Sequence, residues 1–371
     1  MKILFGIPVK DHNEIAMAEV LGFQEIGNEV FTSEYGNSGS AQNLISMFLL
    51  VLKNAIKLKI KSIRHKTDLV FLNTAFDRKT IVRDSITLFF LKFLNKKVKV
   101  VLKTHGTIKA VVFSENFFRN YLFRKADLFL VLSKEELNNF LEAGIDKEKV
   151  NVTCNVVNPL KYTPDPEFKE KNKIEKDKLV LLFVGRFIKE KGIIDLIHAC
   201  KLLKNKGVKF ELLCLGNGAL FENARTLTKS LDLQDDIKFF GHLPESETNS
   251  YYSNCDILIL PTYHEEGFPM AVFNAVACGK PVITTKIRAA ADHLKSFENC
   301  LWVEPEKPED IFQKIEMLAN SQKLRESMVN NNFKLITHFS REMIVNELNL
   351  IFLSFFNKKG HKVHKKLREV I

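Results

Sequence analysis

Two short segments carry residues that could bind a ligand with both phosphate and hydroxyl groups. The first, Leu179 to Gly192, reads LVLLFVGRFIKEKG: an aliphatic strand ends at Gly185 and Arg186, and a helix is expected to begin beside Lys191. An arginine side chain can bind a diphosphate through two N–H groups, and a lysine one turn later adds a point charge. The pattern predicts a diphosphate clamp. Two ordinary surface cations at a loop are the alternative.

The second segment, Leu260 to Thr285, reads LPTYHEEGFPMAVFNAVACGKPVITT. A strand is expected to end at Pro261, a polar loop carries Glu265 and Glu266, and a helix is expected over Met270–Cys278. Open parallel sheets present ligand sites at the carboxyl ends of their strands. An acidic residue suits ligand hydroxyls, and the backbone N–H groups at a helix start suit phosphate. An ordinary strand–helix–strand unit with a solvated acidic loop is the alternative.

Together these segments resemble the signature of glycosyltransferase family 4, a large group of retaining sugar transferases. The shared pattern is VGR-x-x-x-x-KG after the first strand of the second domain, and EGFP followed by a helix that ends in ACGxPV. The resemblance covers roughly residues 175–320 well and the first half of the chain loosely. It implies the GT-B fold, an α/β architecture in which two Rossmann-like, doubly wound domains face each other across a cleft.

The resemblance also implies a role for each motif residue. Arg186 and Lys191 would neutralise the diphosphate of a nucleotide-sugar donor, and Glu266 would bind hydroxyls of the donor sugar. His105, at the end of an expected strand, would support that sugar from the first domain, with a histidine in an ordinary turn as the alternative. The predicted catalytic residues are thus His105 and Glu266, and the predicted donor-binding residues are Gly185, Arg186, Lys191, Gly267, Phe268, Pro269, Met270, Ala271 and Asn274.

Asn274 is a departure from the family pattern, which has a second glutamate eight residues after the first. That glutamate accepts hydrogen bonds from the ribose of the donor. Asparagine offers one carbonyl acceptor and an NH2 donor but no charge. The difference favours one alternative function, a nucleotide-sugar-binding protein with weak or lost catalysis. An epimerase or a phosphorylase of the same fold is a further alternative.

Strands and helices alternate along the chain, as in doubly wound parallel sheets. We expect an acceptor-side domain at 1–158, a Pro-containing and charged linker at 159–178, and a nucleotide-sugar-binding domain at 179–340. By analogy with the family, the helix and tail at 341–371 should pack back on the first domain. The expected strands are Lys2–Ile7, Glu29–Thr32, Leu69–Asn73, Lys99–Lys103, Leu128–Leu132 and Asn151–Val156, then Leu179–Val184, Phe210–Leu215, Ile237–Phe240, Ile257–Leu260, Pro281–Thr284 and Cys300–Val303. The clearest expected helices are Ala41–Arg64, Arg83–Leu94 and Arg341–Phe356.

Positive charge is concentrated in two parts of the chain. Residues 41–125 hold 18 Lys and Arg against 4 Asp and Glu, and Asn357–Ile371 holds 6 against 1. Leu44–Arg64 reads LISMFLLVLKNAIKLKIKSIR, an apolar run that grades into a lysine-rich helix. This surface suits the anionic cytoplasmic face of a bilayer, and a core helix with a solvated lysine face is the alternative. A nucleic-acid partner is not expected, because no nucleic-acid-binding motif accompanies the charge.

Composition agrees with a two-domain globular protein. The chain has 371 residues, 46% hydrophobic and 27% charged, which fits two soluble domains. None of the six cysteines has metal-ligand spacing, so they are expected to be reduced core residues. No Asp-x-Asp pair is placed as a metal site, and the resemblance implies neither a metal nor a cofactor. With no signal peptide or membrane span expected, the sequence predicts a cytoplasmic protein, peripheral on the inner face of the membrane, whose acceptor is a saccharide or a lipid-linked saccharide.

Overall fold

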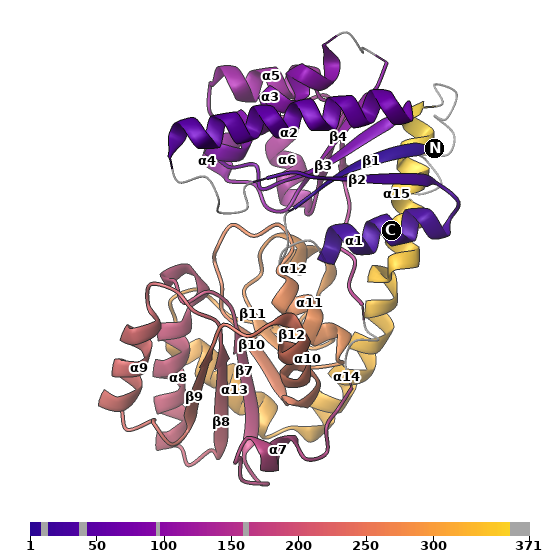
Figure 1. Ribbon diagram of the computed structural model, residues 1–371. Helices are drawn as coiled ribbons and strands as arrows, with labels where there is room; N and C mark the ends of the chain where they lie inside the picture. Colours follow the sequence, from indigo (N-terminus) through magenta and orange to yellow (C-terminus); the bar gives the residue numbers. More distant parts are fainter. Residues whose placement is uncertain (9–13, 37–42, 94–96, 159–162, 357–371) are drawn as a thin grey trace. The chain divides into compact units, whose positions relative to one another are not determined.

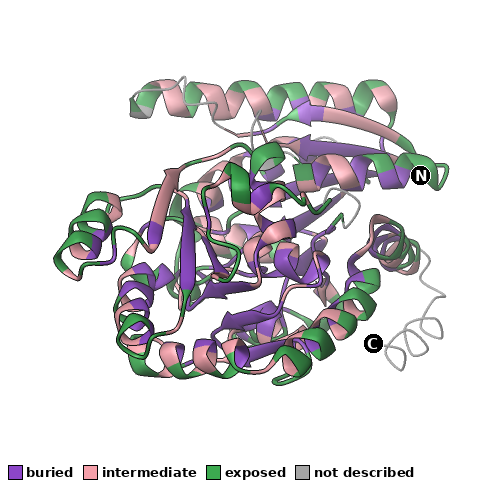
Figure 2. Cartoon of the chain, turned by 90° about the horizontal axis from the view of Figure 1, so that it is seen from below, coloured by how far each residue is buried: buried purple, intermediate pink, exposed green. Residues whose placement is uncertain are grey.

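The computed structural model describes residues 1–8, 14–36, 43–93, 97–158 and 163–356. The chain divides into two compact units. The first contains Met1–Val156, Glu265–Phe268 and the segment from Phe339 onward, and the second contains Val157–His264 and Pro269–His338. In Figure 2 the strands are largely buried, and the helices carry most of the exposed residues.

The first unit is built on a sheet of six parallel strands in the order β2-β1-β3-β4-β5-β6 (Figure 1). Their registers pair Phe5 with Phe71 and Val70 with Val100, so aliphatic and aromatic side chains form continuous rows across the sheet. The strand order reverses between β1 and β3, as in doubly wound sheets. The strands are Lys2–Ile7 (β1), Glu29–Glu34 (β2), Leu69–Thr74 (β3), Lys99–Thr104 (β4), Leu128–Val131 (β5) and Val150–Val152 (β6).

Helices cover both faces of the first sheet. Leu44–His65 (α2), Arg78–Lys92 (α3) and Phe117–Lys125 (α5) pack together on one face, and Glu14–Glu25 (α1) and Arg341–Phe356 (α15) pack together on the other (Figure 1). The rings of Phe23 and Phe352 stack with their centroids 5.6 Å apart. The last described helix therefore belongs to the core of the first unit. The remaining helices of this unit are Lys109–Val112 (α4), Lys134–Glu142 (α6) and the 3-10 turn Lys147–Lys149 (η1).

The second unit also has a sheet of six parallel strands, in the order β12-β11-β10-β7-β8-β9. The order reverses between β10 and β7, and ligands of open α/β sheets bind beside such a reversal. Runs such as LVLLFV and ILIL explain why these strands are buried on both faces. The strands are Leu179–Val184 (β7), Phe210–Leu215 (β8), Ile237–Gly241 (β9), Ile257–Leu260 (β10), Val282–Thr284 (β11) and Cys300–Trp302 (β12).

The helices of the second unit form two groups. Ile193–Asn205 (α8) packs against Phe221–Ser230 (α9) and Pro308–Ala319 (α13), and Met270–Ala277 (α11) packs against Glu245–Asn254 (α10) and Gln322–Ile336 (α14). The shorter elements are Phe168–Lys171 (α7), Lys189–Lys191 (η3), Arg288–His293 (α12) and Thr337–Phe339 (η4), the last of which ends on a residue of the first unit.

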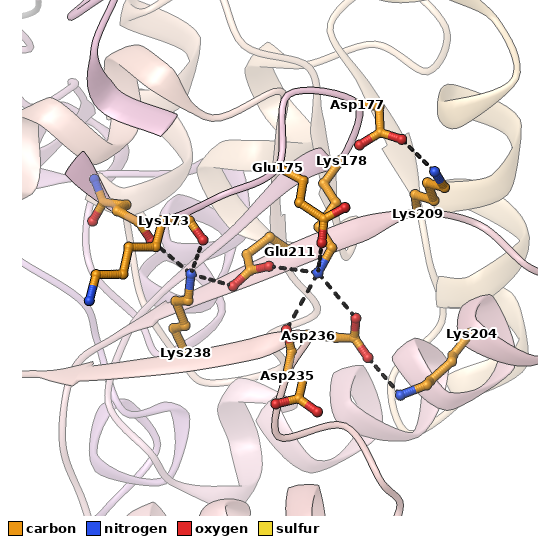
Figure 3. A network of polar contacts seen from close by, with 11 residues as sticks. Lys173, Glu175, Asp177, Lys178, Lys204, Lys209, Glu211, Asp235, Asp236 and Lys238 are labelled. Atoms are coloured by element: carbon orange, nitrogen blue, oxygen red, sulfur yellow. Dashed lines mark hydrogen bonds and ion pairs between the residues drawn. The ribbon is translucent and has the colours of Figure 1, made fainter. Parts of the chain in front are cut away.

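An ion-pair network joins the amino ends of three strands of the second sheet (Figure 3). Glu211, which is buried at the start of β8, pairs with Lys178 at 3.1 Å and with Lys238 at 2.7 Å, and Asp236 pairs with Lys178 at 3.4 Å and with Lys204 at 2.9 Å. Because ligand sites of parallel sheets lie at the carboxyl ends of the strands, this network stabilises the edge opposite to such a site.

Some element boundaries differ from the sequence expectations. The expected strand Asn151–Val156 is only three residues long, and the chain after it has no regular structure. The helix expected from Arg83 begins at Arg78, because Asp77 caps it by accepting hydrogen bonds from the N–H groups of Lys79 and Thr80. The helix expected from Ala41 begins at Leu44, which Asn43 caps.

The segment expected as a linker, 159–178, is part of the second unit in its described residues. Phe168 and Ile174 are buried, and the ring of Phe168 meets that of Tyr251 edge-on with centroids 5.4 Å apart. Prolines and charged residues suggested a linker, but the two apolar side chains anchor the segment to the second unit.

The described residues also bear on the cysteines and on membrane spans. Five of the six cysteines are buried, Cys278 is half-buried, and none of the six forms a disulfide. Among the helices that the structure describes, none is long and apolar enough to cross a membrane. The basic tail Asn357–Ile371 and most of the loop after β1 lie outside the described residues.

Candidate functional site

The first predicted segment ends at the strand reversal of the second sheet. Gly185 and Arg186 follow β7, and residues 261–264 follow β10, its neighbour across the reversal. The carboxyl ends of these two parallel strands lie at the same edge of the sheet. The second unit therefore brings the segment of Arg186 and the start of the second predicted segment, up to His264, to one place.

Arg186 is exposed and is oriented by a residue of the neighbouring segment. Its Nη2 lies 2.8 Å from Nε2 of His264. A guanidinium group only donates, so Nε2 of His264 accepts and the imidazole proton sits on Nδ1. No other hydrogen bond of the Arg186 side chain is found in the described part of the chain, which leaves most of its N–H groups for a ligand.

Lys191 lies in the 3-10 turn η3 and is buried. Its Cδ would lie 3.8 Å from a Cβ atom added to Gly185, so its side chain runs past the end of β7. The turn is tied to the segment after β10, because the carbonyl of Glu190 accepts hydrogen bonds from the N–H of Tyr263 and the hydroxyl of Thr262. Arg186 and Lys191 are thus held at the same strand end.

Two glycines allow this close packing. Gly192 has φ +72°, and a Cβ atom there would lie 2.7 Å from the carbonyl oxygen of Pro261. Gly216, after β8, has φ +130°, and a Cβ atom there would lie 1.9 Å from the carbonyl oxygen of Gly185. Both positions require a residue without a side chain. The turn at 216–218 therefore supports the backbone that carries Arg186.

Helix α11 contributes its N-terminus and one face. No side chain among the described residues caps this N-terminus, at Pro269. Met270, Ala271 and Asn274 share the half-buried face, whereas the other face packs into the core. The Asn274 amide makes no hydrogen bond within the described residues. The predicted donor-binding residues of α11 therefore lie together on its accessible face.

The acidic loop between β10 and α11 has no regular structure. Glu266 is half-buried, Gly267 and Phe268 are buried, and Glu265 is exposed. These four residues group with the first unit, to which His105 also belongs.

His105 follows β4 and is held in a neutral form. Its Nε2 lies 2.7 Å from Oδ1 of Asn73, at the end of the adjacent strand β3. Burial, with the nearby charge of Lys103, lowers the pKa of His105 to about 3. Nε2 therefore donates to Asn73, and Nδ1 keeps a lone pair that can accept a hydrogen bond.

Sequence reasoning missed two residues of this site, His264 and Thr262. Both lie inside the quoted segment, and a polar residue just after a strand end is a signal that could have flagged them. Their partners, Arg186 and Glu190, are more than 70 positions away, so only the paired strands β7 and β10 reveal the contacts.

The comparisons with known proteins agree with this geometry. Residues 164–335 match the family described as glycosyl transferases group 1. The chain is 28% identical over 287 residues to the capsular polysaccharide biosynthesis glycosyltransferase CapM of Staphylococcus aureus, covering 73% of this chain and 74% of that one. It is 26% identical over 216 residues to an N,N'-diacetylbacillosaminyl-diphospho-undecaprenol alpha-1,3-N-acetylgalactosaminyltransferase of Campylobacter jejuni, covering 56% and 55%.

Solved structures share the fold. The Anabaena protein Alr3699/HepE, in complex with UDP and glucose, superposes with a TM-score of 0.74 at 17% identity, over 95% of this chain and 100% of that one. A glycosyltransferase from Rickettsia africae superposes with a TM-score of 0.77 at 19% identity, over 96% and 98%. The expected GT-B architecture of two doubly wound domains is confirmed. Residues 164–335 are thus similar to the glycosyl transferases group 1 family, and the chain, which has the GT-B fold, is similar to glycosyltransferases of bacterial polysaccharide biosynthesis.

Proposed function

We propose that the protein is a retaining glycosyltransferase that moves a sugar from a nucleotide diphosphate sugar to a hydroxyl group of a saccharide acceptor. The observation that supports this most directly is that Arg186 and Lys191 are held together at the strand reversal of the second unit, where β10, the strand that precedes α11, also ends. Two cations and a helix N-terminus at one strand edge suit a departing diphosphate.

In this proposal catalysis comes from positioning and from stabilising the charge of the leaving group. Arg186 and Lys191 neutralise the departing nucleotide diphosphate, and backbone N–H groups from Phe268 to Ala271 assist. Glu266 binds hydroxyls of the donor sugar. Neutral His105 supports the same sugar through a hydrogen bond rather than through charge. The reaction uses no metal ion or cofactor, so a chelator should leave the rate unchanged.

We also propose that the acceptor is lipid-linked and that the product enters surface polysaccharide. The named activities of the CapM and Campylobacter relatives favour this. The exposed apolar residues of α2 also favour it, because they suit peripheral attachment to a cytoplasmic membrane face. UDP is the first donor nucleotide to test, since HepE binds it.

The central experiment is release of the nucleotide from a panel of nucleotide sugars, with and without a membrane extract as acceptor source. Arg186→Ala should lower the rate by roughly 30- to 1000-fold, because removing one preorganised hydrogen-bond donor costs about 2–4 kcal/mol of transition-state stabilisation. Arg225→Ala, an exposed arginine on α9 outside the site, is the matched control. Near-normal turnover of a folded Arg186→Ala protein would remove the diphosphate assignment.

The stereochemistry has a separate test. The anomeric configuration of the product, measured by proton NMR, should equal that of the donor, and an inverted product would contradict the retaining assignment. Asn274 favours a second candidate, a nucleotide-sugar-binding protein without catalysis. That candidate predicts donor binding with no acceptor-dependent release of nucleotide.

A further inference from the structure

A pocket of about 280 Å³ lies in the first unit between α2, α3 and the end of β2. Its position follows from the topology. Tyr35 and Gly36 come directly after β2, and Asp77 and Lys79 lie between β3 and the first turn of α3, so the pocket sits at the carboxyl end of the first sheet. This edge, beside the reversal between β1 and β3, is where doubly wound domains bind ligands. The volume is close to the lower limit of about 300 Å³ for small-molecule sites.

Arg83 supplies a fixed cation to this pocket. Its Nε lies 2.6 Å from Oδ1 of Asp84, and its guanidinium group stacks 4.2 Å from the ring centroid of Tyr35. The hydroxyl of Tyr35 donates to the same carboxylate, which is fully buried. Burial opposes the charge, but Asp84 and Tyr35 outweigh it and raise the pKa of Arg83 above its ordinary value. The guanidinium group is therefore held rigidly as a cation.

The Arg83 side chain retains donors for a ligand. Nη2 makes one long hydrogen bond, 3.4 Å, to the carbonyl of Asn73, and no partner of Nη1 is found among the residues that the structure describes. Asp77, the acidic residue of the pocket lining, already accepts two backbone N–H groups as the cap of α3. Lys79 is exposed and has no side-chain partner in the described ranges. The polar groups not yet engaged here thus include two cations, which suit a phosphate.

The opposite wall is apolar and comes from α2. Met47, Leu50 and Val51 line the pocket at helical spacing. Later on the same face Ala55 and Leu58 are fully buried in the core. The inner face of α2 therefore lines the pocket in the first half of the helix and packs into the core in the second half. Such a wall suits carbon chains.

We propose that this pocket binds the phosphate group and the adjoining carbons of a lipid-linked acceptor, an inference that rests on the proposed function. The guanidinium group of Arg83, which has N–H groups without a partner in the described residues, lies opposite the apolar wall. The pocket between them has room for a phosphate group and a short carbon chain. A neutral sugar would use the polar groups but would leave the apolar wall without a matching surface.

Calorimetric titration of the full chain with octyl phosphate tests this inference, with inorganic phosphate and octyl glucoside as the two reference ligands. Octyl phosphate should bind at least about tenfold more tightly than either reference ligand, because it alone can contact both the cations and the apolar wall of the pocket. Leu50→Glu should abolish the difference, whereas Leu49→Glu, on the exposed face of the same helix, should leave it unchanged. Circular dichroism and thermal melting check that both variants fold.

A second matched pair avoids the risk that Leu50→Glu unfolds α2. Lys79→Glu changes an exposed residue of the pocket rim, and Arg78→Glu changes its exposed neighbour outside the lining. Only Lys79→Glu should weaken octyl phosphate binding, by about tenfold. The proposal would be overturned if both variants of a pair weakened octyl phosphate binding equally. It would also be overturned if octyl glucoside or inorganic phosphate bound as tightly as octyl phosphate.

The titration needs neither donor nor turnover, so the two proposals fail separately. Intact sugar transfer without octyl phosphate binding would remove the pocket assignment and keep the proposed function. Octyl phosphate binding with no transfer from any donor would support the pocket and remove the proposed function.

Discussion

Asn274 is the residue at which the proposed donor site departs from the family pattern. It lies on the accessible face of α11 with no hydrogen bond from its amide in the described residues. Hydrogen bonds that involve a charged group contribute about 1.5–3 kcal/mol, against about 0.5–1.5 kcal/mol for neutral ones. Asn274→Glu should therefore tighten nucleotide binding measured by calorimetry, and Asn274→Ala should weaken it modestly. If neither substitution alters the affinity, the residue does not face the nucleotide.

His105 should remain neutral throughout the physiological range. Burial and Lys103 lower its pKa to about 3, and its Nε2 proton is directed to Asn73. Nitrogen-15 NMR should show the Nε2–H tautomer from pH 8 down to about pH 4, whereas the same histidine in urea should titrate near its unperturbed value of about 6.5. A native midpoint close to the value in urea would show that this imidazole is solvated.

At the level of single residues, the sequence could identify the members of the motifs but not the contacts between them. Arg186 and Lys191 belong to one continuous segment, so their spacing alone placed them at one strand end. His264, 78 positions from Arg186, meets it only because β7 and β10 are neighbours in the sheet. The Gly216–Gly218 turn likewise makes close backbone contact with Gly185 and Phe187, which lie about 30 positions earlier in the chain, because β7 and β8 are neighbours in the sheet.

At the scale of elements, α15 places a half-buried titratable group, Glu347, near a buried lysine of the first unit. Lys103 on β4 is fully buried, with its Nζ 2.5 Å from Oε1 of Glu19 on α1 and 3.1 Å from the carbonyl of Cys154. The charge of Lys103 also acts on the carboxyl group of Glu347 on α15. Burial raises its pKa to about 7, and Lys103 opposes the rise. One lysine thus faces two carboxyl groups, and the second remains protonated below neutral pH.

This raised pKa predicts a loss of stability as the pH rises. The unfolded chain releases the Glu347 proton near pH 4.5 and the folded chain near pH 7. The contribution of Glu347 to the free energy of unfolding is therefore complete below pH 4.5 and is lost as the pH rises through 7. Glu347→Gln cannot ionise. Relative to the native protein, it should gain up to about 3 kcal/mol in the free energy of unfolding between pH 5 and pH 8.

Urea unfolding at the two pH values measures this gain. Glu342→Gln, an exposed acidic residue on the same helix, is the matched control and should show no pH-dependent difference. An equal effect of both substitutions would mean that Glu347 is solvated.

The elements themselves were largely predictable, and the exceptions have physical causes. Most strand limits agree within one or two residues, because strands of doubly wound sheets are buried on both faces and form continuous apolar runs. The polar composition of the segment 159–178 predicts a linker, and the structure adds that its apolar residues Phe168 and Ile174 are buried. Helix starts at Arg78 and Leu44 depend on capping hydrogen bonds of Asp77 and Asn43.

At the scale of the molecule, the first unit exposes more large apolar side chains than the second among the described residues. In the first unit α2 exposes a row of aliphatic residues on its outer face, and α3 exposes Phe89. Lys53 and Lys57 flank the row and are exposed. The row consists of Ile45, Leu49, Ile56, Ile60 and Ile63. An exposed apolar stripe beside cations is typical of helices that lie in a membrane interface.

The last prediction is that this face of α2 binds anionic membranes. The protein should co-sediment with vesicles that contain anionic lipid more than with neutral vesicles, since each Lys or Arg near the surface contributes about 1 kcal/mol. Salt should reverse only part of the binding, because it screens exposed charges but leaves apolar insertion intact. Ile56→Glu with Ile60→Glu should remove the salt-resistant part, whereas Met317→Glu, an exposed apolar residue of the second unit, should not. Equal, negligible sedimentation with both vesicle types would show that the lysine-rich face of α2 is simply solvated and would move the proposed acceptor toward a soluble saccharide.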